Sequence, residues 1–278
     1  MVTWVGLGVA SAGGTGALAR AQASSRASAW TFVYTVTASA NGRRAESADL
    51  ILDVAVWHGV ARIGVRSGGL RRLAGDSGTI LVRSSDSSVV VVNAARREAI
   101  VARGGEVASL VGFGGTGGVQ LTVSDVASSV SRRGRGPTAF TFATQRVDAT
   151  QRYTLQITAG SVVRLLRTDQ QLTLVLSRDL ERLDPGFRSF VTHFLRALDT
   201  PPEVREQLRR SARPLPDGFP VQSVILASTV TGSDTLRTER RAVLSGFRAV
   251  AVDTGTFAVP AGFRVTEMSR LLKTRPRS

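Results

Sequence analysis

The chain has 278 residues, of which 42% are hydrophobic, a composition that suits one large domain with an apolar core. It contains no cysteine, which excludes disulfide bonds, cysteine-ligated zinc, iron–sulfur clusters, a thiol nucleophile and a lipid-modified N-terminal cysteine. The net charge of +15 favours anionic surfaces, including a membrane with anionic head groups. Because the arginines are scattered and aromatic residues make up only 6%, we expect no nucleic-acid partner.

Residues 1–23 are predicted to be an export signal. An apolar stretch rich in Gly and Ala, residues 2–19, precedes an Ala-Gln-Ala cleavage pattern at 21–23, which places the cut before Ser24. Export signals usually have Lys or Arg before the apolar stretch, and none is present here. A misplaced translation start is one explanation of this departure. A transmembrane helix is the competing interpretation, and Arg20 with the many glycines argues against it. The sequence therefore predicts a periplasmic or secreted protein.

The first half of the chain is predicted to be a meander of short strands. In residues 30–37, every second side chain is a large apolar one, and Asn41-Gly42 is a strong signal for a two-residue hairpin turn. Similar runs follow, separated by turn residues, at 48–57, 60–66, 79–83, 89–92 and 99–102. Short strands with turns roughly every ten residues indicate an antiparallel sheet rather than βαβ units.

The glycine-rich residues 103–118 are expected to connect two halves of the sheet. Gly112, Gly114 and Gly117 match the spacing of a dinucleotide fingerprint, but strand-like residues follow where that motif requires a helix. The second half is predicted to contain strands at 119–123, 139–147, 152–158, 161–167, 170–177, 220–229, 234–243, 249–253 and 257–263. Gly246 and Gly255 are expected to mark turns between the last of these.

A helical pair, residues 184–212, interrupts these strands. Asp184 suits the N-cap of the first helix and Pro185 its first position. One apolar face follows helical spacing and consists of Phe187, Phe190, Val191, Phe194, Leu195 and Leu198. Thr200 is expected to cap the second helix. We thus expect a single domain at 24–268 with this helical insertion, followed by a basic tail at 269–278 that is frayed from residue 271.

The residues that carry chemistry do not form a recognisable catalytic pattern. His58 lies at a strand–turn boundary and His193 on the more polar side of the first helix, and neither has carboxylates at metal-ligand spacing. No Gly-x-Ser-x-Gly elbow is present. We therefore expect a protein that is not an enzyme and that has no metal and no cofactor.

From about residue 138 to 268, the order of elements resembles a family of exported bacterial proteins related in architecture to the LolA-like periplasmic lipoprotein carriers. Four pieces carry the resemblance: Tyr153 to Ile157, Leu183-Asp184-Pro185 with its helix, Gly218 to Ser223, and Phe257 to Phe263. The last of these, FAVPAGF, is similar to a closing segment, F-x-V-P-x-G-[FY], common in such families.

The resemblance implies a mainly β protein of the α+β kind. A large curved antiparallel sheet, a half-barrel, would have the helical pair over its concave face. In carriers of this kind that face is apolar and accepts the acyl chain of a lipid or lipoprotein. Phe187, Phe190, Phe194 and Leu198 would then face the ligand. The alternative is a structural or protein-interaction module of the cell envelope, in which these four side chains simply fill the core.

Overall fold

The computed structural model describes residues 26–44, 49–68, 70, 75, 78–108, 110, 119–199 and 202–274. The predicted export signal, the glycine motif at 112–117 and the expected cap Thr200 lie outside these residues. Within the described ranges, no helix is both long and apolar enough to cross a membrane.

In this part of the chain, thirteen strands form one open sheet in the order β13-β7-β6-β5-β4-β3-β1-β12-β11-β10-β9-β8, with β2 paired to β1. The pairing is antiparallel except between β13 and β7. The strands are β1 (Arg26–Ala40), β2 (Arg43–Arg44), β3 (Leu50–Trp57), β4 (Val60–Ser67), β5 (Thr79–Arg83), β6 (Ser88–Asn93), β7 (Glu98–Arg103), β8 (Val119–Arg135), β9 (Gln145–Ala159), β10 (Val162–Ser177), β11 (Phe219–Thr231), β12 (Asp234–Asp253) and β13 (Arg264–Glu267).

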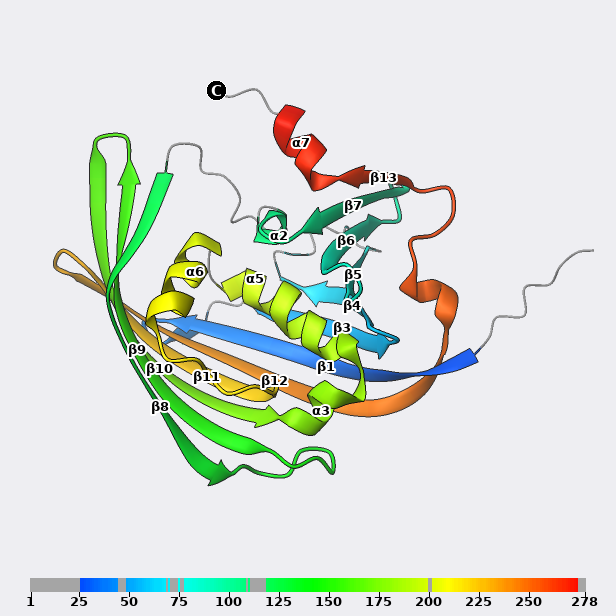
Figure 1. Cartoon of the computed structure of the whole chain (residues 1–278), viewed down its shortest axis with the longest axis horizontal. Coiled ribbons are helices and arrows are strands. Elements are labelled where there is room, and N and C mark those ends of the chain that lie inside the picture. Colours follow the sequence, from blue (N-terminus) through cyan, green and yellow to red (C-terminus); the bar gives the residue numbers. More distant parts are fainter. Residues whose placement is uncertain are drawn as a thin grey trace, which may run out of the picture.

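The helices lie on the concave side of the sheet, which bends around them (Figure 1). The connection between β10 and β11 supplies most of them: α3 (Arg178–Leu183), α4 (Pro185–Ser189), η3 (Phe190–Leu195), α5 (Arg196–Asp199) and α6 (Pro202–Ser211). Three short elements lie elsewhere: α2 (Glu106–Ala108), η4 (Thr254–Phe257) and α7 (Met268–Thr274). The predicted fold class, a curved and mainly antiparallel sheet with helices over its concave face, is confirmed.

Several strands are longer than the sequence indicated. Residues 145–159, 162–177 and 234–253 are each one continuous strand, although two strands were expected in each region. Gly246 does not make a turn. It has a φ of 64° and forms a bulge in β12 opposite the step from Thr31 to Val33. Such a bulge bends a strand without ending it, so β12 can follow the curvature of the sheet.

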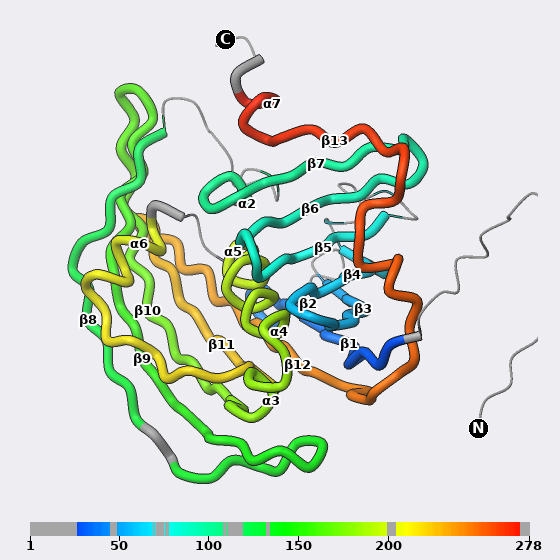
Figure 2. Tube along the Cα trace, turned by 45° about the vertical axis from the view of Figure 1, so that its right-hand side comes forward, coloured from blue at the N-terminus to red at the C-terminus, as the bar shows by residue number. Residues whose placement is uncertain are grey.

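The C-terminal elements also differ from the expectation. Residues 257–263 were predicted to be a strand, but the Asp253 carboxylate accepts a hydrogen bond from the amide of Gly255 at 2.9 Å and starts the 3₁₀ helix η4 instead. The pairing strand is β13, beside β7 (Figure 2). The expectation of a frayed tail is wrong for residues 271–274, which belong to α7 (Met268–Thr274). Met268 at its start packs against the core and holds this helix on the domain.

An aromatic cluster joins the helices to the sheet. Phe187 and Phe190 contact the ring of Phe32 on β1, with centroids 5.7 and 5.8 Å apart, and Phe219 at the start of β11 lies edge-on to Phe187 at 5.4 Å. Phe187, Phe190 and Phe219 are fully buried. Aromatic side chains of this size dominate core energetics, so the cluster fixes where the helices lie on the sheet.

Asp184 connects the helical segment to the sheet by a second, polar route. Its Oδ1 accepts hydrogen bonds from the amide of Gly186, at 2.7 Å, and from the amide of Gly59 in the β3–β4 turn, at 2.8 Å. Asp184 is the N-cap of α4, as the sequence predicted. One carboxylate oxygen therefore caps the helix and ties it to the turn.

We predict that Asp184→Ala lowers the free energy of unfolding by about 2 kcal/mol, because it removes a helix cap and leaves a turn amide without its acceptor. Urea unfolding followed by circular dichroism measures this change. Asp184→Asn is the matched control, since its amide oxygen can still accept both hydrogen bonds, and it is expected to lose less than half as much. Equal losses in the two variants would contradict the assigned role.

Candidate ligand-binding site

A cavity of about 200 Å³ lies between the helical segment and the concave face of the sheet. Strands β10, β11, β12 and β1 form its floor, η3 and α5 one wall, and the segment before β11 another. Its lining consists of Tyr34, Leu172, Leu174, Leu176, Val191, Leu195, Arg196, Leu215, Pro216, Gly218, Pro220, Ser223, Ile225, Arg240 and Ala242. Most of these residues are apolar.

The strand register explains why these side chains meet. Leu172 on β10 lies opposite Ile225 on β11, which in turn lies opposite Arg240 on β12. The next row on the same face contains Leu174, Ser223 and Ala242. Because alternate residues of a strand share a face, these rows line the cavity and the intervening residues point to the outside.

Four polar groups border the cavity, and two of them are in direct contact. Tyr34 is buried, and its side chain hydrogen-bonds to Ser223. Burial raises the pKa of Tyr34 to about 12, against the lowering effects of the nearby Arg240 charge and of the Ser223 hydrogen bond. Burial lowers the pKa of Arg240, and Tyr34 partly offsets this effect. Arg196 lies on the exposed side of α5.

The predicted ligand-binding side chains lie beside this cavity rather than along it. Phe187, Phe190 and Phe194 are fully buried, and Leu198 is partly buried against the same core. None of the four is part of the described lining. The helix contributes Val191 and Leu195 instead, which belong to the same predicted apolar face.

The two histidines lie apart from the cavity. His58 is in the β3–β4 turn with φ 46°, and its ring lies 4.6 Å from that of Trp57. His193 is in η3, where burial and then the charge of Arg196 lower its pKa. Among the described residues, no group of three or more His, Asp or Glu side chains could hold a metal ion.

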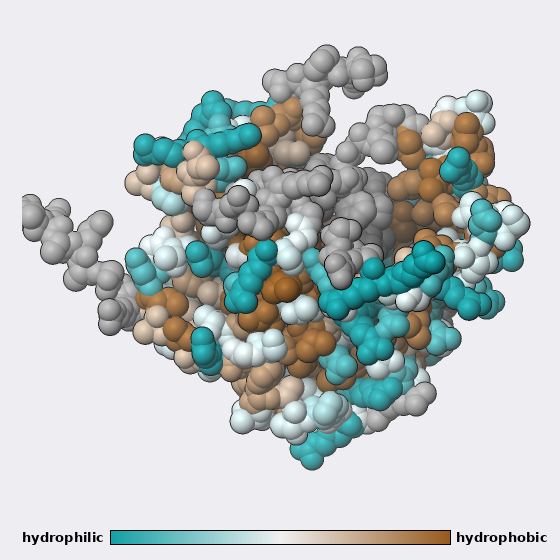
Figure 3. All heavy atoms as spheres, turned by 180° about the vertical axis from the view of Figure 1, so that it is seen from behind, coloured by the Kyte–Doolittle hydropathy of each residue, from teal (hydrophilic) through white to brown (hydrophobic). Residues whose placement is uncertain are grey.

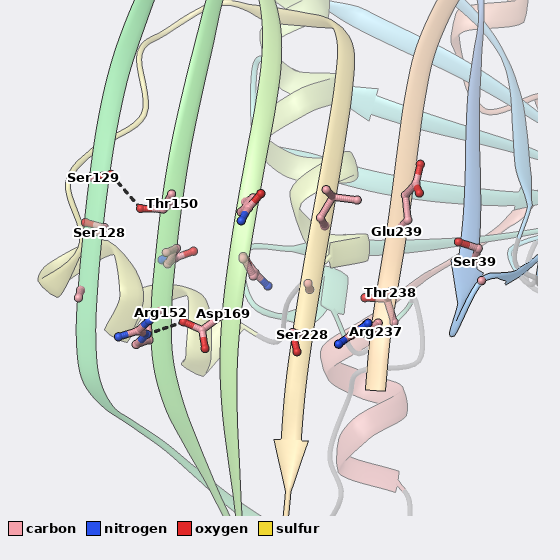
Figure 4. Close-up of a pocket in the computed structure, with 17 residues that line it drawn as sticks. Ser39, Ser128, Ser129, Thr150, Arg152, Asp169, Ser228, Arg237, Thr238 and Glu239 are labelled. Carbon is pink, nitrogen blue, oxygen red and sulfur yellow. Dashed lines mark hydrogen bonds and ion pairs between the residues drawn. The ribbon is translucent and has the colours of Figure 1, made fainter. Parts of the chain in front are cut away.

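A larger hollow of about 770 Å³ lies across the opposite face of the long strands. Figure 4 shows its side chains standing in rows on neighbouring strands, with hydroxyl groups and charges prominent. The Ser129 and Thr150 hydroxyls lie 2.8 Å apart, and Arg152 forms an ion pair with Asp169. Its floor is the open surface of the sheet, with no helix over it, so it would enclose an acyl chain less completely than the cavity on the concave side.

Comparison with known proteins identifies no family. No family model matches the chain, and no curated protein matches it. A solved structure described as "Structure of PNGF-II in P21 space group" matches with a TM-score of 0.33 and 10% identity, over 85% of this chain and 31% of that one. The chain thus spans less than a third of that protein, and a likeness of this size shows neither family nor function.

The raised pKa of Tyr34 predicts a loss of stability in alkali. Between pH 10 and about 12, the unfolded state loses the phenol proton while the folded state keeps it, so the folded state binds more protons and its stability falls as pH rises. A shift of this size corresponds to about 3 kcal/mol. We expect the difference in free energy of unfolding between the wild type and Tyr34→Phe to change by this amount across the interval.

Denaturant unfolding at a series of pH values measures this difference. Tyr153→Phe is the comparison: burial also raises the pKa of Tyr153, but this side chain is only partly buried, so a smaller change is expected. A difference between the wild type and Tyr34→Phe that stays constant from pH 10 to 12 would show that Tyr34 ionises as freely in the folded state as in the unfolded one.

Proposed function

We propose that this chain is an exported, non-enzymatic protein of the cell envelope that binds the acyl chain of a lipid or lipoprotein on the concave face of its sheet. The observation that supports this proposal is the apolar cavity between η3 and strands β10 to β12. Apolar cavities with a few polar groups at defined positions are the usual form of ligand sites. Binding of an acyl chain requires no catalytic group.

The size of the cavity sets what it can hold. At ~30 Å³ for a group of the size of water, a space of 200 Å³ holds about six or seven such groups. Burying that many methylenes is worth about 5 kcal/mol before the cost of association, at ~0.8 kcal/mol each. The cavity therefore suits a short chain or one end of a long chain, and a longer ligand requires the cover to move.

The segment η3 is the cover that would move. Residues 190–195 form a π-helix, a rare geometry that is frequent at functional sites. Val191 and Leu195 from this segment border the cavity, while Phe190 and Phe194 pack into the core beside it. A displacement of η3 would enlarge the cavity, and it would have to loosen the core packing of Phe190 and Phe194.

A second candidate function, an interaction module of the envelope, has its own support. Phe187, Phe190 and Phe194 fill the core, and β8 lies at one end of the strand order. At the β9–β10 hairpin, Val163 and Leu165 are 55% and 57% exposed. Figure 3 shows hydrophobic residues gathered over this end of the molecule, at its upper right. Exposed apolar surface of this kind suits a protein or membrane partner.

Organic extraction of the purified protein, followed by mass spectrometry, separates the two candidates. The acyl-chain proposal predicts lipid at a ratio near one per chain, or stoichiometric uptake of a fluorescent acyl probe by the lipid-free protein. A folded protein that carries no lipid and takes up no probe would overturn this proposal and leave the interaction module.

We predict that Leu172→Trp weakens binding of the acyl probe at least tenfold, because the indole occupies part of a cavity of only 200 Å³. Fluorescence titration measures the affinity. Leu226→Trp is the matched control: Leu226 is on the neighbouring strand β11, 43% exposed, and on the outer face. The affinity of the Leu226→Trp variant for the probe should stay within twofold of that of the wild type. Equal effects of the two substitutions would show that the probe binds elsewhere.

A further inference from the structure

We propose that the tip of the β9–β10 hairpin, residues 160–167, is a membrane-docking surface that enters the interfacial region of a bilayer containing anionic lipids. This inference goes beyond the proposed function, because it concerns the surface by which the protein meets a membrane and not the cavity. The hairpin tip and the cavity use different residues of β10, so each can be tested without the other.

The tip carries a dense group of exposed apolar side chains. Val162, Val163 and Leu165 are 54%, 55% and 57% exposed. Among the large apolar side chains in the described part of the chain, only Val265 on β13 is also more than half exposed. Single exposed apolar residues are common on protein surfaces, whereas three within four consecutive residues indicate a site of interaction.

These apolar side chains lie on both faces of the hairpin. Successive residues of a strand point to opposite faces, so Val162 points to one face and Val163 and Leu165 to the other. A protein partner that packed on the hairpin as a second layer would cover one face and leave the other in water. A bilayer surrounds a hairpin that enters it, and this difference favours a lipid surface over a protein partner.

The tip extends beyond the neighbouring hairpin. The pairing of β10 with β11 ends where Arg167 lies opposite Val230, whereas the pairing of β10 with β9 continues to Val162 opposite Ala159. Residues 162–166 therefore project past β11 by about 16 Å, at ~3.3 Å per residue. Figure 1 shows this hairpin at the upper left, at the end of the molecule away from η4. From this position it can reach a bilayer ahead of β11 and β12.

The charge of the hairpin complements an anionic membrane. Residues 149–168 contain three arginines and no Asp or Glu. Arg152 forms an ion pair with Asp169. Arg164 and Arg167 are exposed beside and directly behind the apolar tip. Cationic side chains next to aliphatic ones are typical of segments that lie at the boundary between head groups and acyl chains.

The backbone sets a limit on the depth of insertion. In the described part of the chain, no strand pairs with β10 at residues 162–166 on the side where β11 lies further along. Peptide groups on that free edge would be costly in hydrocarbon, where no water can satisfy them. We therefore expect the backbone of the tip to stay among the head groups while the three apolar side chains reach below them.

Flotation of the full chain with lipid vesicles tests the inference. One set of vesicles is phosphatidylcholine alone, and in the other about one third of the lipid is phosphatidylglycerol. We expect the chain to bind the anionic vesicles at least tenfold more tightly than the neutral ones, and the preference to weaken at high salt.

Variants with matched controls assign the binding to the hairpin. Val163→Asp with Leu165→Asp should weaken binding to the anionic vesicles at least tenfold. Val265→Asp introduces the same charge at an equally exposed valine of β13, at the opposite edge of the sheet, and should leave the affinity within about twofold of that of the wild type.

A second pair of variants tests the charge. Arg164→Gln should weaken binding to the anionic vesicles about fivefold, the factor expected for one arginine near such a surface. Arg248→Gln removes an exposed arginine of β12 and should change this affinity by less than twofold. Circular dichroism of each variant checks the fold.

A fluorophore on the tip reports insertion directly and requires no loss of binding. Because the chain contains no cysteine, Val163→Cys provides a single labelling position. An environment-sensitive dye at this position should shift its emission to the blue with anionic vesicles and be quenched by nitroxide-labelled lipids. The same dye on Val265→Cys should show neither change.

Three results would overturn the inference. The first is a folded chain that binds neither kind of vesicle, which would leave a protein as the partner of the hairpin. The second is vesicle binding without a spectral shift at position 163, and the third is an equal loss in the hairpin and β13 variants. Each of these results leaves the acyl-chain proposal standing, since that proposal is tested by uptake of the acyl probe in the absence of vesicles.

Discussion

The packing of Phe187 and Phe190 against Phe32 is the interaction on which the rest of the structure depends. A strongly curved sheet exposes a wide apolar concave face, and it is stable in water only when that face is covered. The aromatic cluster provides the cover and positions it along β1, the strand that joins the short strands β3 to β7 to the long strands β8 to β12. The Asp184 carboxylate adds a directional contact that sets how α4 enters this arrangement.

The same packing explains why a cavity lies beside the cluster. The rings of Phe187 and Phe190 pack against β1 and the start of β11, and the cavity lies to one side of them, where the facing side chains are leucine, isoleucine and serine. Close packing is the rule in protein interiors, so a space of this size between a helix and a sheet is a feature to be explained. In our account it is explained by a ligand.

Local signals were sufficient to predict much of this fold and little of the site. The short strands end at turns such as Asn41-Gly42 and His58-Gly59, and the positive φ angles of these residues match the predicted turns. The sequence predicts two strands in place of β12, because Gly246 looks like a turn in sequence, whereas the curved sheet uses it as a bulge. In β9 and β10, short polar stretches such as Thr168-Asp169 look like turns but lie within a continuous strand. The cavity depends on contacts between distant elements. Nothing in the local sequence distinguishes Arg240, which lines the cavity, from Arg241, which does not. The alternation along the strand does place residues 240, 242 and 244 on one face.

The most direct test of the central claim is a crystal structure of the full chain with octanoate that carries bromine on its terminal carbon. The anomalous scattering of bromine locates the end of the chain without reference to a fitted ligand. We predict one strong peak within the cavity between η3 and β10. A peak in the outer hollow beside Arg152, or the absence of any peak at saturating ligand, would contradict it.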